Sequence, residues 1–444
     1  MIRVITYGTY DLLHYGHVRL LQRAKALGDY LIVGVTADDF DKTRGKINVK
    51  QTLMERIENV RSTGLADEII VEEYEGQKID DIRRYGIDIF TVGSDWQGKF
   101  DYLSKYCKVI YLERTEGVSS SEIRSEKRKI RLGLVGNPQN FIKFIRESKY
   151  VNGVDIVGIN YIRQDFIAEG LDDIPVYSGN YQHFLDTVDA VCVFSHPSNH
   201  AYQVRTALLH GVHVLCEAPM TYSAAQTKEL FQTAHQNHCI LMEGIKTAYS
   251  TAYSRLLLLV KSGKIGEVVS VDATCTSLQD MFGIQQDERW NSISAWGPIG
   301  LLPVFQLLGT KYVQKLITSK LSDTDPNFDL FTKINFTYPT ATATVKVGKG
   351  VKSEGELIIS GTQGYVYVPA PWWKTDYFEI RYEDATNNKR YFYQLDGEGI
   401  RYEIVAFLRS IEMGKNGSYI SEEVSTGIGG IFEDFINKRD FIKI

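Results

Sequence analysis

The chain has 444 residues, too many for one hydrophobic core, so its length predicts two or three domains. Hydrophobic residues make up 43% and charged residues 24%, which is ordinary globular composition. A formal net charge of -5 excludes a global attraction to nucleic acid or to an anionic membrane. No apolar run reaches the ~20 residues that cross a bilayer, and the chain opens on a strand-like run rather than a leader. We therefore expect a cytoplasmic protein without membrane insertion.

Strand-like and helical runs alternate in the first third of the chain, which predicts a parallel α/β sheet. The strand-like runs are residues 2–6, 30–36, 68–71 and 89–92, and the helical runs are 18–27, 53–61 and 79–85. Gly28 follows the first helical run, where we expect it to end the helix with a positive φ. The same alternation starts again after the basic stretch 125–129, Ser-Glu-Lys-Arg-Lys, which we interpret as a domain boundary.

Beyond Gly266 the pattern changes to longer β-rich runs, at 268–276, 328–337, 341–347 and 356–360. This order predicts a Rossmann-like α/β domain at 1–127, a second Rossmann-like domain at 130–250 and an α+β domain with an antiparallel sheet at 251–444. The five cysteines are scattered without the paired spacing of metal ligands, and we expect free thiols: Cys107, Cys192, Cys216, Cys239 and Cys275.

Residues 8–17, Gly-Thr-Tyr-Asp-Leu-Leu-His-Tyr-Gly-His, follow the first strand and open the first helix. An open α/β sheet exposes backbone amides to an anion at this place. His14 and His17 are three residues apart at the helix start, so both rings can point at phosphate oxygens, and Gly16 allows a close backbone approach. We interpret the segment as a triphosphate site; two histidines that cap a turn are the structural alternative.

The segment matches the HxGH signature of the nucleotidylyltransferase superfamily. Residues 92–101, Val-Gly-Ser-Asp-Trp-Gln-Gly-Lys-Phe-Asp, and 114–124, Arg-Thr-Glu-Gly-Val-Ser-Ser-Ser-Glu-Ile-Arg, resemble the corresponding segments of bacterial glycerol-3-phosphate cytidylyltransferases. The resemblance covers residues 1–126, and Val118, Ser120 and Ser121 are mild departures that keep the hydroxyl groups. It implies transfer of CMP from CTP to a polyol phosphate, with Mg²⁺ accompanying CTP, to make a CDP-alcohol for a cell-surface polymer.

The resemblance also implies roles for single residues. The catalytic group, which stabilises charge on the triphosphate, is His14, His17, Lys46 and Arg114. The nucleotide-binding group is Thr9, Tyr10, Asp11, Gly16, Gly93, Asp95, Trp96, Thr115, Ser119 and Ser120. Asp95 would accept from the cytosine amine, and Asp11 would organise the site, contact Mg²⁺ or cap a helix. No metal site built by the protein alone is expected.

One departure affects acceptor binding. The family carries an arginine where this chain has Gly64, and Arg61 lies one turn earlier. Either Arg61 supplies the charge that binds the acceptor's phosphate, or the acceptor differs from glycerol 3-phosphate.

From residue 130 onward the chain resembles the Gfo/Idh/MocA oxidoreductases, on the segments 194–200, 214–219, 263–266 and 397–403. Their chemical residues are missing. Pro138 and Phe141 occupy the second and third glycine positions of the dinucleotide fingerprint, no acidic residue follows the second strand at Asn160, Ala218 replaces the lysine of the Glu-Lys-Pro motif, and Ala295 and Ile299 replace the Asp and His or Tyr.

These losses predict a non-catalytic region that does not bind NAD(P) and serves as scaffold, oligomerisation surface or sugar-phosphate sensor, in a homo-oligomer. Two alternatives stay open. The region is a variant enzyme that uses Lys246, so that the chain is a bifunctional reductase and cytidylyltransferase, or the whole chain is a non-catalytic binding protein.

Overall fold

The computed structural model describes residues 1–37, 49–73, 76–113, 129–136, 138–161, 174–278, 291–323, 325, 328–393, 395 and 397–444. It divides into two compact units, residues 1–129 and residues 130–444, which we call the first and the second unit.

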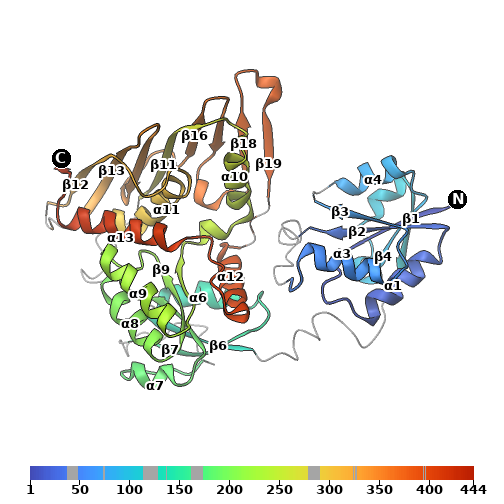
Figure 1. Ribbon diagram of the computed structural model, residues 1–444, viewed down its shortest axis with the longest axis horizontal. Coiled ribbons are helices and arrows are strands. Elements are labelled where there is room, and N and C mark those ends of the chain that lie inside the picture. Colours follow the sequence, from blue (N-terminus) through green and yellow to red (C-terminus); the bar gives the residue numbers. More distant parts are fainter. Residues whose placement is uncertain are drawn as a thin grey trace. The chain divides into compact units, whose positions relative to one another are not determined.

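The first unit is a five-stranded parallel sheet in the order β3-β2-β1-β4-β5 (Figure 1). Its strands are β1 (Arg3–Gly8), β2 (Tyr30–Thr36), β3 (Glu68–Glu72), β4 (Ile89–Gly93) and β5 (Lys108–Leu112). Its helices are α1 (Tyr15–Lys25), α3 (Leu53–Ser62) and α4 (Gln77–Tyr85), with the 3₁₀ turns η1 (Ser94–Trp96) and η2 (Asp101–Lys105). The predicted parallel α/β sheet is confirmed.

Alternate residues of each strand face opposite sides of this sheet, as strand geometry requires. Val4 belongs to the core beneath α1 and α3, and its neighbour Ile5 belongs to the core beneath α4 and η2. Helices therefore cover both faces, and the loops that leave the carboxyl ends of β1 and β4 meet at one edge, where an open α/β sheet binds ligands.

The expectation for Gly28 is wrong. Helix α1 ends earlier, at Lys25, and Gly28 does not lie among the glycines with positive φ. A Cβ at this position would lie 2.6 Å from the carbonyl oxygen of Ile2 and 2.7 Å from Cγ2 of Val4. Glycine is needed here because the chain passes closely against β1, not because it ends a helix in a left-handed conformation.

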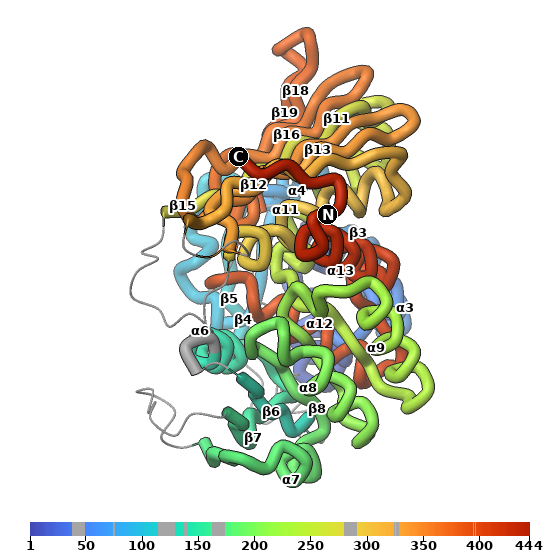
Figure 2. Tube along the Cα trace, turned by 90° about the vertical axis from the view of Figure 1, so that its left-hand side faces the viewer, coloured from blue at the N-terminus to red at the C-terminus, as the bar shows by residue number. Residues whose placement is uncertain are grey.

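The second unit begins with another five-stranded parallel sheet, in the order β10-β9-β8-β6-β7. The strands are β6 (Ile130–Gly136), β7 (Val154–Asn160), β8 (Ala190–Phe194), β9 (His213–Glu217) and β10 (Leu241–Gly244). Helices α7 (Tyr181–Leu185), α8 (Pro197–Leu209) and α9 (Ala224–Gln236) pack on one face, and α8 and α9 lie side by side in Figure 2. Helix α6 (Pro138–Ser148) follows β6 in the chain and packs against α12 (Ile400–Met413).

The rest of the second unit is built on a ten-stranded sheet in the order β19-β18-β17-β16-β11-β14-β13-β12-β20, with β15 beside β11. The strands are β11 (Val268–Leu278), β12 (Gln314–Leu321), β13 (Asp329–Thr337), β14 (Thr342–Gly348), β15 (Gly350–Val351), β16 (Leu357–Gly361), β17 (Tyr365–Val368), β18 (Tyr377–Arg381), β19 (Lys389–Phe392) and β20 (Phe441–Lys443). The sheet is mixed rather than purely antiparallel, because β11 pairs with β14, and β12 with β20, in parallel.

Helices α10 (Thr251–Lys261), α11 (Ser292–Leu308) and α13 (Glu422–Ile436) accompany this sheet; α11 contacts β11, β13 and β14, and α13 packs on α11 and α9. The 3₁₀ turns η3 (Lys246–Tyr249), η5 (Trp372–Lys374) and η6 (Ala385–Asn387) complete the described elements.

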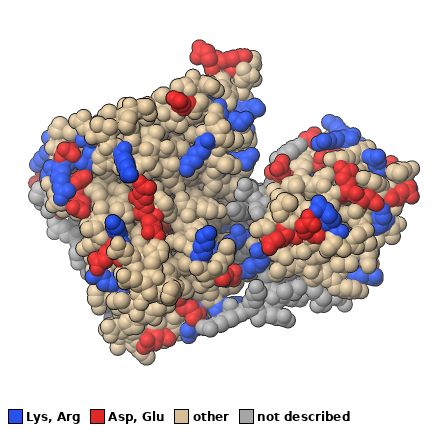
Figure 3. Space-filling model, in the orientation of Figure 1, with Lys and Arg blue, Asp and Glu red and all other residues tan. Residues whose placement is uncertain are grey.

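All five cysteines are free thiols, as expected. In the part of the chain that is described, no helix combines the length and the apolar character that crossing a membrane requires. On the face drawn in Figure 3, lysine and arginine are interspersed with aspartate and glutamate.

Candidate functional site

The loop between β1 and α1 is held in an unusual backbone conformation. Tyr10 has φ 53° and Leu12 has φ 50°, both in the left-handed region that residues other than glycine rarely adopt. The buried Tyr10 ring packs against Gly8, where a Cβ would lie 3.0 Å from the ring. The backbone N–H of Leu12 donates to Oε1 of Gln51 at 2.8 Å. Packing of the Tyr10 ring and the hydrogen bond to Gln51 thus support the strained backbone, and such strain often marks functional sites.

His14 and His17 form a stacked pair at the start of α1. His14 precedes the helix with φ -130°, and its Nδ1 accepts a hydrogen bond from the backbone N–H of Gly16 at 3.1 Å. A neutral His14 must then carry its proton on Nε2. The two ring centroids are 3.9 Å apart at 22°, and Tyr10 meets His17 edge-on at 5.5 Å. Imidazole N–H groups at a helix N-terminus are suited to phosphate oxygens.

Asp11 organises the backbone of the segment that leads into α3. Its buried carboxylate accepts from the backbone N–H of Lys50 at 3.0 Å and of Gln51 at 3.0 Å. Helix α3 itself is capped by Thr52, whose side chain forms a capping box with Glu55. The geometry therefore favours an organising role for Asp11.

Arg56 is a central residue that sequence reasoning missed. It is fully buried, and its Nη1 donates to the carbonyl oxygens of Thr9 at 2.7 Å and Thr36 at 2.8 Å, while Nε donates to that of Gln51 at 3.2 Å. One guanidinium thus ties the ends of β1 and β2 to the segment before α3. A buried arginine is rare without such partners, but its position on a helix start gave no signal of burial.

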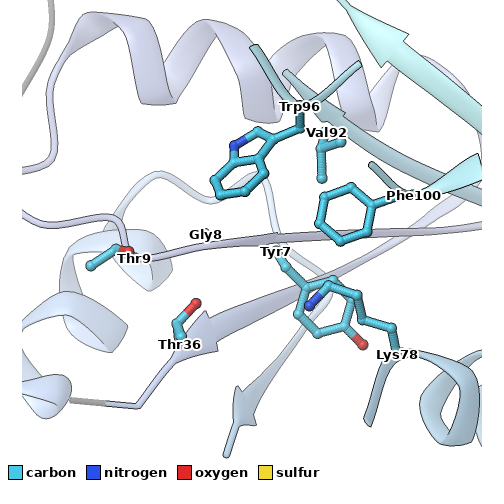
Figure 4. Close-up of a pocket in the computed structure, with 8 residues that line it drawn as sticks. All are labelled: Tyr7, Gly8, Thr9, Thr36, Lys78, Val92, Trp96 and Phe100. Atoms are coloured by element: carbon cyan, nitrogen blue, oxygen red, sulfur yellow. The ribbon is translucent and has the colours of Figure 1, made fainter. Parts of the chain in front are cut away.

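A small pocket opens at the carboxyl edge of the sheet (Figure 4). It is lined by Tyr7, Gly8, Thr9, Thr36, Lys78, Val92, Trp96 and Phe100. The Lys78 ammonium group lies over the Tyr7 ring, 4.6 Å from its centroid, and forms an ion pair with the buried Glu72, which also accepts from Thr36 at 2.9 Å. Burial, followed by the nearby Asp81, raises the pKa of Tyr7, so this phenol stays neutral.

The end of β4 supplies the remaining described part of the predicted nucleotide site. A Cβ at Gly93 would lie 2.5 Å from Oδ1 of Asp95, so the absence of a side chain lets this carboxylate fold back over the strand end. Asp95 is exposed, whereas Trp96 is half-buried and lines the pocket with Thr9. The structure thus brings Thr9 and Trp96 to one cavity and groups His14 with His17 and Tyr10.

Other predicted residues are not placed there. Lys46, Arg114, Thr115, Ser119 and Ser120 lie outside the described residues. Arg61 stands in the last turn of α3, where it is 60% exposed and forms an ion pair with Glu58. It is not among the residues that line the pocket, and its contact with the acceptor stays a prediction.

The turn after the first strand of the second unit has the tight glycine conformation of a dinucleotide-binding fold, but larger residues follow it. Gly136 has φ 116°, and a Cβ there would lie 2.3 Å from the backbone nitrogen of Ser195. Pro138 is the first residue of α6, and Phe141 is fully buried with its ring 6.2 Å from that of Phe194. Ala218 is buried.

Two family models match the chain, one in each unit. The model described as "Cytidylyltransferase-like" matches residues 5–126, and that described as "Oxidoreductase family, NAD-binding Rossmann fold" matches residues 130–245. The glycerol-3-phosphate cytidylyltransferase of Bacillus spizizenii is 47% identical over 131 residues, which are 28% of this chain and 97% of that protein. That of Staphylococcus aureus is 48% identical over 129 residues, 28% of this chain and 95% of that protein.

The fold of the second unit also occurs in solved structures. A 3-ketoreductase from Actinomadura kijaniata, in complex with NADP and TDP-benzene, matches 71% of this chain and 99% of its own with a TM-score of 0.62 and 19% identity. This likeness establishes the fold alone. Through its first unit the chain belongs to the cytidylyltransferase-like family of nucleotidyltransferases, and it joins this domain to a Rossmann-like region that matches the oxidoreductase family model over residues 130–245.

Proposed function

We propose that the first unit transfers CMP from CTP to a small polyol phosphate, glycerol phosphate or a related compound. A phosphate oxygen of the acceptor attacks the α-phosphorus of CTP, the bond from that phosphorus to the bridging oxygen breaks, and pyrophosphate leaves with the electron pair. No covalent enzyme intermediate is required, so positioning and charge stabilisation are the main tasks. The product is a CDP-alcohol, which we propose is used to build a cell-surface polymer.

The stacked pair of His14 and His17 is the observation that carries this proposal. Both imidazoles stand at the N-terminus of α1, directly after the strained loop, where N–H donors and the helix dipole favour phosphate. We assign them to the α- and β-phosphate oxygens. The predicted partners Lys46, Arg114, Thr115, Ser119 and Ser120 complete this assignment through the family resemblance.

Mg²⁺ fits this site only as a companion of the nucleotide. The described residues contain no group of three or more His, Cys, Asp or Glu side chains that would hold an ion. Asp11 already accepts backbone hydrogen bonds from Lys50 and Gln51. Mg²⁺ would therefore take most ligands from triphosphate oxygens and water, and would neutralise charge on the leaving pyrophosphate.

We further propose that the pocket beside Thr9 holds the acceptor. It lies at the same strand end as the histidines, and Thr9 and Trp96, which the resemblance assigns to the nucleotide, form the part of its wall that faces CTP. The rest of the lining combines the rings of Tyr7 and Phe100 with the Lys78 ammonium group, which the acceptor's phosphate would share with Glu72. Such a lining suits a short carbon chain that ends in a phosphate. Arg61 remains the alternative source of positive charge.

Pyrophosphate release with CTP or ATP, measured against a panel of polyol phosphates, tests the proposed reaction. We expect at least a tenfold preference for CTP in kcat/KM, because the implied base site is built for a pyrimidine. The variants Lys78→Ala and Arg61→Ala then distinguish the two candidate acceptor sites. Loss of the residue that binds the acceptor should raise KM for the acceptor and leave KM for CTP unchanged. Equal use of ATP would remove the cytidylyl assignment while keeping nucleotidyl transfer.

For the second unit we propose a non-catalytic role. Pro138 has no N–H to offer a pyrophosphate, and Phe141 fills the space next to the first turn of α6. Asn160 stands where a carboxylate would bind a ribose, but it carries an amide. Its side chain donates to the carbonyl oxygen of Tyr177 at 2.7 Å. Ala218 offers no cation to a reacting oxygen, which argues against the bifunctional alternative.

Titration of the full-length protein with NADH and NADPH, followed by nicotinamide fluorescence and calorimetry, tests this role. We expect no saturable binding at micromolar concentration. Binding in that range would show that other residues have replaced the lost motifs and would favour the bifunctional reductase.

We also propose that the protein acts in the cytoplasm, in keeping with its free thiols. We further propose that the second unit mediates self-association, so that truncation after Lys129 lowers the oligomeric state.

A further inference from the structure

Two lysines of the second unit converge on a single carboxylate oxygen. Oε2 of Glu398 accepts from Nζ of Lys246 at 3.1 Å and from Nζ of Lys374 at 2.6 Å. Lys246 is 27% exposed, Lys374 is 38% exposed and Glu398 is 33% exposed, so solvent and a solute can reach all three side chains. They come from η3, from η5 and from the segment just before α12, which are far apart in the sequence.

A pair of tryptophans stands next to these lysines. Trp373 precedes Lys374 in η5, and its ring centroid lies 4.9 Å from that of Trp296 on α11. Thr247, the neighbour of Lys246, donates from Oγ1 to the carbonyl oxygen of Trp373 at 3.1 Å, which fixes η3 against η5. The tryptophan pair therefore places apolar ring surface beside the element that carries Lys374.

The charges of this group do not balance. Lys374, followed by Lys246, lowers the pKa of Glu398 to about 2, so this carboxylate is fully ionised and supplies one negative charge against two positive ones. Lys246 also interacts with the carboxyl group of Glu403, whose burial raises its pKa to about 8. Glu403 is therefore mostly protonated at pH 7 and does not offset the second lysine. One positive charge remains for an anion.

We propose that Lys246, Lys374, Trp296 and Trp373 form a second binding site for a phosphorylated polyol, the class of compound that the first unit is proposed to use as acceptor. The two ammonium groups bind the phosphate, each with N–H donors left over beyond its bond to Glu398. The neighbouring indole rings offer apolar surface to the C–H groups of the carbon chain. None of these four residues belongs to the hydride-transfer set of the oxidoreductase resemblance. Identification of the ligand rests on the proposed function of the first unit, whereas the site itself does not.

Calorimetric titration of the full-length protein with glycerol 3-phosphate and with ribitol 5-phosphate tests the site. We expect two binding events per chain for the polyol phosphate that the first unit accepts. The double variant Lys246→Ala/Lys374→Ala should lose one of them, with affinity weakened at least tenfold, while kcat/KM for cytidylyl transfer stays unchanged. Lys320→Ala, at an exposed lysine of β12, is the matched control and should keep both events.

The variant Glu398→Gln separates binding from a purely structural role. If the lysines bind phosphate, removing the competing carboxylate should tighten the second site several-fold. If Glu398 only clamps η3 and η5 together, the variant lowers thermal stability and leaves binding of the ligand unchanged or absent, which would overturn the proposal.

Titrations with inorganic phosphate and with ribitol examine the ligand class. We expect both to bind at least tenfold more weakly than the polyol phosphate, and Trp373→Ala to abolish this preference. Equal affinity for inorganic phosphate would overturn a polyol site. The outcomes for the two units are distinguishable: loss of the second binding event with intact turnover concerns only this site, whereas absent turnover with a retained event that depends on Lys246 and Lys374 concerns only the first unit.

Discussion

The two units start from the same architecture and differ in the segment that leads from their first strand into their first helix. After β1, a loop with Tyr10 and Leu12 in left-handed conformations leads into a helix that begins with two stacked histidines. After β6, Gly136 turns tightly against Ser195, and α6 begins with a proline. Both sheets keep apolar strands with helices on their faces. The comparison shows that two sheets with the same kind of apolar core can carry different residues at the edge where ligands bind.

The first prediction tests the chemistry at the edge of the first unit. His17→Ala should lower CTP turnover by two or more decades without unfolding the protein, because loss of a preorganised phosphate contact typically costs ~3 kcal/mol or more in the transition state. His196→Ala is the matched control: His196 precedes α8, and its Nδ1 accepts from the backbone N–H of Ser198, much as His14 does before α1. Pyrophosphate release should stay normal in that control. Normal release in a folded His17→Ala protein would remove the site assignment.

The second prediction tests whether Phe141, which stands at the position of the third fingerprint glycine, is part of the core of the second unit. Phe141→Ala should destabilise this unit by about 3 kcal/mol, since truncation of a fully buried phenylalanine typically costs 3–5 kcal/mol. Urea unfolding followed by circular dichroism measures the change, and CTP turnover should be unaffected. Phe392→Ala, at a side chain that is 66% exposed, should shift the transition little. Equal effects of the two variants would contradict a structural role for Phe141.

The third prediction concerns two buried carboxyl groups of the second unit. Burial raises the pKa of Glu403 from 4.5 to about 8 and that of Glu243 to about 7, and each has one oxygen without a hydrogen-bond partner in the described chain. The folded state thus holds protons that the unfolded chain has released above about pH 4.5. Stability of this unit should fall as pH rises from about 5 to 8, by up to ~1.4 kcal/mol per pH unit and group.

Glu403→Gln, which stays neutral, should flatten this fall, and Glu383→Gln, at an exposed position, should not. Thermal unfolding between pH 5 and pH 8.5 provides the measurement. Parallel curves for wild type and Glu403→Gln would mean that Glu403 is already ionised in the folded protein.

Sequence reasoning succeeded where the signal is local. The alternation of strands and helices, the restart of that pattern after residue 129 and the position of His14 and His17 at a helix start all depend on neighbours within a few residues. The interpretation of Pro138 and Phe141 as replacements for the second and third fingerprint glycines also rests on short spacing, and it stays a prediction. The role of Gly28 was misjudged because its constraint comes from Ile2 and Val4 in another element.

The sequence by itself determined the kind of fold and the family of the first unit, because periodicity and short motifs are properties of consecutive residues. Tertiary structure alone decided which distant groups meet. Arg56 is buried because its guanidinium finds carbonyl acceptors at the ends of two strands and before α3. Lys246, Lys374 and Glu398 meet because three segments of the second unit pack together. A charged side chain becomes buried or clustered only where folding supplies partners that offset its desolvation, and spacing in the sequence does not encode those partners.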